Sequence, residues 1–247
     1  MSTLARKNAE DHLRASPDPG DRLSSLQAAA RGRDSMDLLK WVIEEEFRDK
    51  IALVSSFGAE SAVLLDLVAQ VAPDTPVVFL DTRKLFGETL RYRDQLKERL
   101  GLTNILSIEP DPGEVEQEDR NGLLWTRNVD ACCGLRKVRP LARAMEGFDA
   151  WITGRKRFQS STRAEIPLIE QSGAKFKVNP LADWTPEHIE AYRKDRDLPP
   201  HPLVKDGFLS IGCMPCTRPV RPGESARDGR WAGLDKTECG IHVAENI

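Results

Sequence analysis

The sequence predicts an α/β fold: a single Rossmann-like domain with a mostly parallel sheet flanked by helices, followed by an irregular C-terminal tail. Two features of the pattern carry this prediction. Short apolar runs with the length of buried strands alternate along the chain with longer amphipathic segments of helical period. Alternation of this kind is typical of parallel sheets covered by helices on both faces. The 247 residues are enough to bury a substantial core in one such domain.

The first half of the chain supplies three of the expected strands. Residues 1–20 are polar and are expected to form a flexible N-terminus. A charged helix should end at Gly101, because glycine is the common residue just beyond a helix C-terminus. In chain order the predicted elements are helices over 21–48, a strand at 51–54, a helix through 63–68, a strand at 76–80, a helix at 87–100 and a strand at 104–108.

The second half supplies two more strands and the tail. The acidic segment 109–119 is predicted to be a loop, because it contains two prolines and a glycine. The remaining elements are a helix that carries Cys132 and Cys133 through Met145, strands at 150–153 and 176–178, and a helix that begins near Thr185. We therefore expect an α/β nucleotide-binding domain at 21–200 and a separate C-terminal segment at 201–247, rich in glycine, proline and charge.

Composition excludes several classes of function. The net charge of −3 argues against a broadly basic surface for nucleic acid. No run approaches the roughly 20 apolar residues that span a bilayer, and the N-terminus has no apolar core typical of a signal peptide. An odd number of cysteines, five, together with that N-terminus favours a reducing cytoplasm. We expect a cytoplasmic protein with no nucleic-acid or membrane partner.

Two loops at the predicted ligand edge could bind an anion or a nucleotide. Ligands on parallel sheets bind beyond the carboxyl ends of the strands. The loop Ser55–Ser61 (S-S-F-G-A-E-S) has small residues before a helix N-terminus, which suits a phosphate or sulfate, although a plain serine-capped turn fits equally well. Leu80-Asp81-Thr82 ends the second strand, where a carboxylate and a hydroxyl could bind ribose or simply cap a turn.

A third loop, after the fourth strand, is basic. It places four cations within nine residues: Arg155, Lys156, Arg157 and Arg163. Arginine guanidinium groups match phosphate and sulfate with two parallel hydrogen bonds. In an acidic protein this cluster favours an anion site over a solvated charged loop.

The five cysteines divide into two pairs and one single residue. Cys132-Cys133 and Cys213-x-x-Cys216 offer four thiolates, which fit either tetrahedral zinc or a [4Fe–4S] cluster. The spacing leaves that choice open. Arg136, Lys137 and Arg139 follow the first pair, where their charge would offset the thiolates. Cys239 lies beside Lys236 and His242, and nearby cations make a thiol a better nucleophile, although a stray surface cysteine is the simpler interpretation of this residue alone.

Together these motifs resemble the family of assimilatory adenylyl-sulfate and phosphoadenylyl-sulfate reductases, over roughly residues 51–242. The resemblance implies an adenine nucleotide alpha hydrolase-like fold. It is carried by the order of six motifs: Ser55–Ser61, Leu80-Asp81-Thr82, Cys132-Cys133 with Arg136-Lys137, Thr153–Ser160, Gly212–Arg218 around the C-x-x-C pair, and Glu238-Cys239-Gly240-Ile241-His242.

The resemblance implies a covalent mechanism. The Cys239 thiolate would attack the sulfur of the adenylated sulfate, AMP would leave, and thioredoxin or glutaredoxin would release sulfite from the S-sulfocysteine by thiol exchange. Arginines would screen the negative sulfonate. The implied substrate-binding residues are Ser55, Ser56, Phe57, Gly58, Leu80, Thr82, Lys137, Arg155, Lys156, Arg157, Arg163 and His242.

The resemblance also implies a cofactor and a substrate. Cys132, Cys133, Cys213 and Cys216 match the branch of the family with one [4Fe–4S] cluster per chain, which mostly uses adenosine 5′-phosphosulfate. Two residues depart from the usual pattern, Arg83 where glycine is common and Phe158 where aspartate is common. The additional cation at position 83 keeps the 3′-phosphorylated substrate, or use of both substrates, open. Homo-oligomerisation is also left open.

Two other classes of protein share some of these features. An ATP pyrophosphatase or sulfate adenylyltransferase relative would share the scaffold but typically carries S-G-G-x-D-S after the first strand, and this chain lacks the Gly-Gly and the Asp. A non-enzymatic zinc or iron–sulfur regulator would explain four cysteines, but neither Cys239 nor the anion loops.

Overall fold

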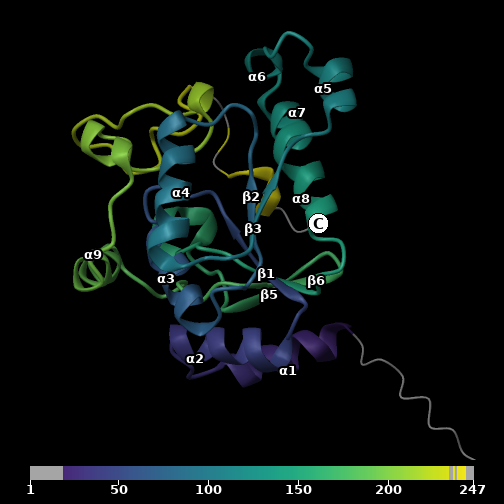
Figure 1. The fold of residues 1–247 in the computed structure, drawn as a ribbon, viewed down its shortest axis with the longest axis vertical. Helices are drawn as coiled ribbons and strands as arrows, with labels where there is room; N and C mark the ends of the chain where they lie inside the picture. The colour runs from purple at the N-terminus through teal and green to yellow at the C-terminus, as the bar shows by residue number, and fades with distance from the viewer. Residues whose placement is uncertain (1–18, 234–235, 237, 243–247) are drawn as a thin grey trace, which may run out of the picture.

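The computed structural model describes residues 19–233, 236 and 238–242, so most of the N-terminal segment predicted to be flexible lies outside the described residues (Figure 1). Helices and strands alternate, as the sequence predicts. The helices are α1 (Pro19–Ala30), α2 (Ser35–Lys40), α3 (Ser61–Val71), α4 (Gly87–Leu100), α5 (Pro112–Glu118), α6 (Leu124–Arg127), α7 (Val129–Cys133), α8 (Arg139–Ala144) and α9 (Pro186–Asp195). The strands are β1 (Ile51–Ser55), β2 (Val77–Leu80), β3 (Ile105–Ile108), β4 (Ala150–Ile152), β5 (Ile169–Ser172) and β6 (Lys175–Val178).

The six strands form one sheet in the order β3-β2-β1-β4-β6-β5. Every neighbouring pair is parallel except β5 and β6, which form an antiparallel hairpin at one edge. The prediction of a mostly parallel sheet in a single α/β domain is confirmed. β2 and β4 flank β1 on its two sides. Because β1 and β4 are parallel neighbours, the loops that follow them begin side by side at the same edge of the sheet.

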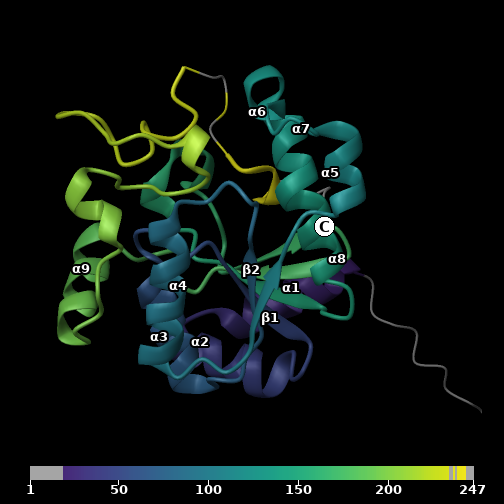
Figure 2. The ribbon, with the colours of Figure 1, turned by 45° about the horizontal axis from the view of Figure 1, so that its top comes forward.

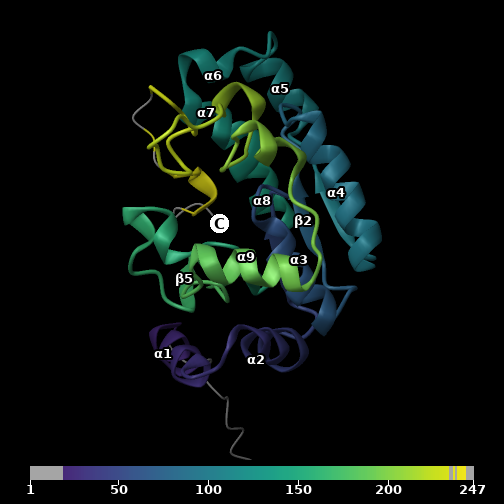
Figure 3. The same ribbon diagram turned by 90° about the vertical axis from the view of Figure 1, so that its left-hand side faces the viewer.

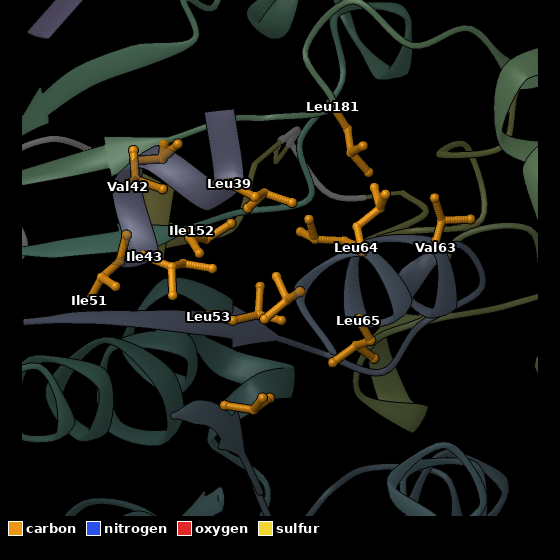
Figure 4. Close-up of a cluster of buried hydrophobic side chains, with 14 of the residues drawn as sticks. Leu39, Val42, Ile43, Ile51, Leu53, Val63, Leu64, Leu65, Ile152 and Leu181 are labelled. Carbon is orange, nitrogen blue, oxygen red and sulfur yellow. The ribbon is translucent and has the colours of Figure 1, made fainter. Parts of the chain in front are cut away.

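Alternate residues of a strand point to opposite faces of the sheet. Helices cover both faces, so the side chains on each are buried. Leu53 of β1 and Ile152 of β4 pack with α2 and α3, and Figure 4 shows their side chains turned toward those of Leu39 and Leu64. On the other face Ala52, Val78 and Trp151 pack with Leu141 and Met145. In Figure 1, α3 and α4 lie on one side of the strands, and α7 and α8 lie on the other.

The C-terminal segment crosses the carboxyl ends of the strands. Where it is described, it contains short 3₁₀ turns, at Pro202–Asp206, Met214–Cys216 and Gly240–His242, rather than longer regular elements. Figure 2 shows this segment, in yellow, at the same end of the molecule as α6 and α7, and Figure 3 shows α1 and α2 at the opposite end. Within the described residues, no helix is long and apolar enough to cross a membrane.

The structure corrects two sequence predictions. The acidic segment 109–119 is not a loop throughout, because Asp111 accepts hydrogen bonds from the backbone N–H groups of Gly113 and Glu114 and so begins helix α5. Strand β5 was not predicted, since only its first residue is apolar. The predicted helix through 132–145 is present, with a π-helical turn at Gly134–Val138 between α7 and α8.

A buried ion pair fixes the cysteine-bearing helices against the sheet. Arg136 donates from Nε and Nη2 to Asp119 Oδ2 at 3.1 and 2.7 Å, and from Nη1 to the Thr82 carbonyl oxygen at 3.0 Å. Asp119 also accepts a hydrogen bond from the Leu124 backbone N–H. The side chains of Asp119 and Arg136 are 0% and 6% exposed. This pair therefore joins the end of α5, the start of α6, the loop after β2 and the turn after α7.

Asp119→Asn should lower the free energy of unfolding by about 3 kcal/mol, because removing one partner of a buried pair leaves the other charge uncompensated. The Arg136 guanidinium, working against burial, holds the pKa of Asp119 below its usual value. The carboxylate therefore stabilises the fold above its unfolded pKa near 4, and this contribution is lost as the pH falls below that value. Urea unfolding at pH 7 and pH 3 measures both effects.

Glu116→Gln is the matched control for that experiment, because its ion pair with Arg120 is exposed. We expect its effect on the free energy of unfolding to stay within about 0.5 kcal/mol. An Asp119→Asn protein as stable as Glu116→Gln at pH 7 would contradict a structural role for the buried pair.

Candidate active site

A cavity of about 470 Å³ lies beyond the carboxyl ends of β1, β2 and β4. The loops after these three strands form its walls, together with the C-terminal segment. Residues from every predicted ligand loop meet there, as expected for the edge of a parallel sheet. The predicted residues that line it are Ser55, Ser56, Gly58, Leu80, Thr82, Lys137, Arg155, Lys156, Arg163, Cys239 and His242.

Two predicted binding residues are placed elsewhere. The Phe57 side chain is fully buried and packs edge-on against Phe79, with ring centroids 5.4 Å apart. Arg157 forms an ion pair with Asp183 and donates from Nε to the Ile166 carbonyl oxygen. Neither side chain lines the cavity, so the structure does not place them in contact with a ligand there.

Most cations of the cavity are matched by three carboxylates. Lys156 Nζ lies 2.8 Å from Glu60 Oε2. Glu170 forms ion pairs with both Arg155 and Lys177, the latter at 3.4 Å. Burial and the neighbouring Arg155 charge lower the pKa of Lys177 to about 7. The cavity is therefore basic, but much of its positive charge is already neutralised by the protein.

The third carboxylate, Glu238, directly precedes the candidate nucleophile. Its Oε1 accepts from Arg163 Nε at 2.6 Å, and its Oε2 accepts from Arg163 Nη2 at 2.8 Å. Arg227 Nη2 lies 3.6 Å from the same carboxylate. Burial opposes ionisation, but these arginines hold the pKa of Glu238 below its usual value.

Two cations stand out because no described carboxylate forms an ion pair with them. Lys137 lies close to the thiols: burial lowers its pKa, and the neighbouring Cys213, Cys239 and Cys133 outweigh that effect and raise it. Arg230 is placed over the Trp231 ring, 4.4 Å from its centroid, and burial lowers the pKa of its guanidinium. Its Nε is buried without a hydrogen-bond partner among the described residues. These two cations are available to an anion.

Cys239 is half-buried at the edge of this cavity. A hydrogen bond from the Cys133 thiol lowers the pKa of Cys239, and the charges of Lys137 and Arg230 lower it further. The same hydrogen bond and burial raise the pKa of Cys133. This arrangement favours a Cys239 thiolate, the nucleophilic form of cysteine.

His242 lines the same cavity as the candidate nucleophile Cys239. Its ring stacks on Trp151 with centroids 5.9 Å apart and an interplanar angle of 1°. Lys177 Nζ lies 4.8 Å from the centroid of the same tryptophan ring. Burial, followed by the charges of Arg155, Arg163, Lys177 and Arg227, holds the pKa of His242 well below its usual value. This environment therefore favours the neutral imidazole.

A smaller cavity next to the first is lined by all four paired cysteines, Cys132, Cys133, Cys213 and Cys216. Asn128 caps α7 and so orients the first pair. The second pair sits on the 3₁₀ turn Met214–Cys216, which an isolated β-bridge between Leu85 and Cys213 holds beside the loop after β2. Fold contacts therefore bring together two pairs that are far apart in the sequence.

The chemistry of this smaller cavity suits a group held by four thiols. Its walls also carry Lys84, Arg136 and Lys137, and Thr82 Oγ1 lies 3.2 Å from Cys213 Sγ. Burial is the main effect that raises the pKa of Cys132 and of Cys216, and the neighbouring thiols raise it further. No three His, Cys, Asp or Glu side chains of the described residues are arranged to hold a single metal ion.

Arg136, Lys137 and Arg139 follow Cys133, and all three are predicted to offset the charge of the thiolates. In the structure their contacts differ. Arg136 is taken up by Asp119, although its charge still lowers the pKa of Cys132 against burial. Arg139 forms ion pairs with Glu118 and Glu114 of α5. Lys137 alone of the three faces both cavities.

Sequence reasoning missed several residues of the larger cavity. Arg227, Arg230 and Trp231 line it, although no strand precedes them. The signal in the sequence was the density of arginine between residues 218 and 230, close before Cys239. Two charged residues that form ion pairs beside the cavity, Glu238 and Lys177, carry no such signal, because Glu238 lies within a motif and Lys177 within a strand.

Comparison with known proteins agrees with the fold. A family model described as phosphoadenosine phosphosulfate reductase domain matches residues 50–219. A protein of Mesorhizobium japonicum named adenosine 5′-phosphosulfate reductase is 49% identical over 98% of this chain and 95% of its own. A protein of Xylella fastidiosa named phosphoadenosine 5′-phosphosulfate reductase is 42% identical over 93% of this chain and 97% of its own.

Among solved structures, the phosphoadenylyl-sulfate reductase of Candida auris, in complex with phosphate, is similar in fold. It matches with a TM-score of 0.68 and 25% identity, over 83% of this chain and 99% of that chain. The sequence resemblance stated above is thereby confirmed, and the chain belongs to the phosphoadenosine phosphosulfate reductase domain family.

Proposed function

We propose that this protein reduces adenosine 5′-phosphosulfate to sulfite and AMP in sulfate assimilation, through an S-sulfocysteine on Cys239. The observation that carries the proposal is the position of Cys239, in a cavity at the nucleotide edge of the sheet beside Lys137 and Arg230. A thiolate that must attack a negatively charged sulfonate needs such cations close to the reacting sulfur. Relatives with nearly full-length matches bear the corresponding name.

The loop after β1 suits the nucleotide. Ser55, Ser56 and Gly58 line the cavity just before the N-terminus of α3, where backbone N–H groups favour a phosphate. A Cβ at Gly58 would lie 3.3 Å from Ser56 Oγ and 3.4 Å from the Ile211 carbonyl oxygen. The glycine therefore keeps the loop close to the C-terminal segment, with room for a ligand between this loop and the cations.

The chemistry proceeds in two thiol steps. Cys239 Sγ attacks the sulfur of the sulfate, a sulfur–sulfur bond forms, and the bond from sulfur to the bridging oxygen breaks, with AMP leaving with the electron pair. One thiol of thioredoxin (or glutaredoxin) then attacks Cys239 Sγ, sulfite leaves, and a second thiol of the donor resolves the mixed disulfide. The two donor thiols supply the two electrons that convert sulfate to sulfite.

Cys132, Cys133, Cys213 and Cys216 are proposed to hold one [4Fe–4S] cluster per chain. Four soft donors around one cavity, with cations beside them, support this assignment. When bound, the cluster would supply charge and rigidity next to the sulfate site. Free thiols of this kind also support a cytoplasmic location.

The unphosphorylated nucleotide is the favoured substrate. Arg83, the one residue that argued for a 3′-phosphate, forms an exposed ion pair with Glu109 and does not line the cavity. Reduction of 3′-phosphoadenylyl sulfate, alone or beside the first substrate, remains the second candidate, because a relative at 42% identity bears that name.

Cys239→Ser should abolish formation of sulfite and of labelled protein from ³⁵S-substrate, because the oxygen of serine does not perform thiol exchange. Iron and acid-labile sulfide contents should equal those of the native protein, since Cys239 is not one of the four proposed ligands. Sulfite release that persists in the variant with thioredoxin present would contradict the mechanism. A native protein that lacks iron and contains zinc would contradict the cluster.

Arg230→Gln should lower the rate of label transfer to Cys239 by about 100-fold, the typical cost of removing one preorganised charge partner from a developing transition state. Arg218→Gln is the control, because Arg218 forms its ion pair with Glu224 and does not line the cavity. Rapid-quench measurements without thioredoxin isolate this step. Equal rates for the two variants would remove Arg230 from the proposed site.

Adenosine 5′-phosphosulfate should be preferred over its 3′-phosphorylated form by at least about tenfold in kcat/KM, since a buried phosphate without its own cations is disfavoured. Arg83→Gly should leave that ratio unchanged within about twofold. Steady-state assays with both nucleotides measure the ratio. A large loss of activity toward the 3′-phosphorylated form in Arg83→Gly would favour dual use of the two substrates.

A further inference from the structure

The chain directly after Cys239 folds into the 3₁₀ turn Gly240–His242. The His242 backbone N–H donates to the Cys239 carbonyl oxygen at 3.0 Å and closes this turn. A Cβ at Gly240 would lie 3.2 Å from Val138 Cγ2, so the turn packs closely against the π-helical turn before α8. Ile241 packs against the core cluster that covers one face of the sheet. The position of Cys239 is therefore tied to the position of this turn.

Two paired residues of the sheet contact His242. Trp151 of β4 lies opposite Lys177 of β6 in the strand register, so both side chains point to the same face. The Trp151 ring stacks on the His242 imidazole, with centroids 5.9 Å apart and an interplanar angle of 1°. Lys177 Nζ lies 4.8 Å from the centroid of the Trp151 ring and 3.5 Å from the His242 carbonyl oxygen. The pair therefore contacts both the side chain and the backbone of His242.

Lys177 is an unusual residue for its position, because its side chain is only 2% exposed. Burying a charged group is costly, and an apolar side chain of similar size would avoid that cost. Its Nζ has two acceptors, Glu170 Oε1 at 3.4 Å and the His242 carbonyl oxygen. The charged and the neutral amine can both donate, so this contact does not depend on the pKa of Lys177, which is lowered to about 7. The contacts that the lysine makes are the best explanation for its presence there.

Neither Trp151 nor Lys177 lines the main cavity. Arg163, which contacts the residue before Cys239, does line it. A ligand in the cavity can therefore engage Arg163 without displacing the contacts between His242 and the sheet. The segment that carries Cys239 thus has an attachment for which the substrate does not compete.

We infer that Trp151 and Lys177 form a seat for the 3₁₀ turn Gly240–His242 and so position Cys239 for attack. The inference rests on the proposed function for the identity of the substrate and of the reaction. Both are positioning residues, because neither lines the cavity in which the substrate is proposed to bind. They act on the reaction through the turn that they hold.

Lys177→Met should lower the rate of label transfer from ³⁵S-substrate to Cys239 by about tenfold or more, because small displacements of a reacting group are costly. In a Cys239→Ser background, which prevents reaction, the same change should alter the dissociation constant of adenosine 5′-phosphosulfate by less than about threefold. If Lys177→Met weakens binding as much as it slows label transfer, Lys177 acts as a substrate ligand and the inference is wrong.

Lys175→Met is the matched control. Lys175 lies on the same strand, two residues earlier, and donates to the Phe148 carbonyl oxygen at 2.7 Å, at the end of β6 away from the cavity. Its label transfer and its affinity should stay within about twofold of the native values. Equal slowing in Lys175→Met and Lys177→Met would overturn the inference.

Two variants of Trp151 test the stacking contact. Trp151→Phe and Trp151→Leu both shorten a core side chain, but only phenylalanine keeps an aromatic face for His242. Label transfer in Trp151→Phe should stay within about threefold of the native rate, and Trp151→Leu should be about tenfold slower. Equal rates in the two variants would show that stacking does not position the turn.

Hydrogen–deuterium exchange tests the seat without the reaction. In Lys177→Met the backbone of the peptide that contains Cys239–His242 should exchange several-fold faster than in Lys175→Met, while peptides from β1 and α3 exchange as in the native protein. Equal exchange of the Cys239–His242 peptide in both variants would overturn the seat, whether or not the native protein forms an S-sulfocysteine. Absence of label in the native protein and in Lys175→Met would overturn the proposed function instead.

Discussion

The charge balance of the main cavity is the constraint on which the rest of the site depends. Arg155, Lys156, Lys177 and Arg163 are buried, and an uncompensated buried charge costs several kcal/mol. Three glutamates, Glu60, Glu170 and Glu238, meet these charges, and each comes from a different part of the chain. The loop after β1, the edge hairpin and the C-terminal segment are thus held to the basic loop after β4 by the same requirement.

The two cavities share a wall, and this sharing links the proposed cluster to the proposed chemistry. Lys137 and Cys213 line both cavities, and Cys133 lines the smaller one while its thiol contacts Cys239. The buried contact of Arg136 with Asp119 sets the position of the turn that carries Lys137. A change in this turn would therefore alter the surroundings of the four paired thiols and of Cys239 together.

The parallel strands and the loops that follow them were predictable, because burial on both faces gives apolar runs such as 51–54 and 150–153 that are readable without a structure. The directions in which loop side chains point could not be predicted, because no repeating pattern constrains them. Phe57 therefore entered the core and Arg157 turned to Asp183. Strand β5 could not be predicted, because its pairing with β6 depends on a tertiary contact. The position of Arg230 in the cavity could not be predicted either, because the C-terminal segment reaches the cavity without a preceding strand.

The register of the antiparallel edge hairpin of β5 and β6 decides whether the buried cations near the cavity receive their counter-charge. In its register Glu170 lies opposite Lys177, and Glu170 also reaches Arg155. Because side chains alternate along a strand, a shift of one residue would turn Glu170 to the other face of the sheet. The core of the domain would still be built, yet Arg155 and Lys177 would lose their counter-charge. The charge balance around the candidate nucleophile Cys239 thus depends on the correct pairing of a short edge strand about 70 residues earlier in the sequence.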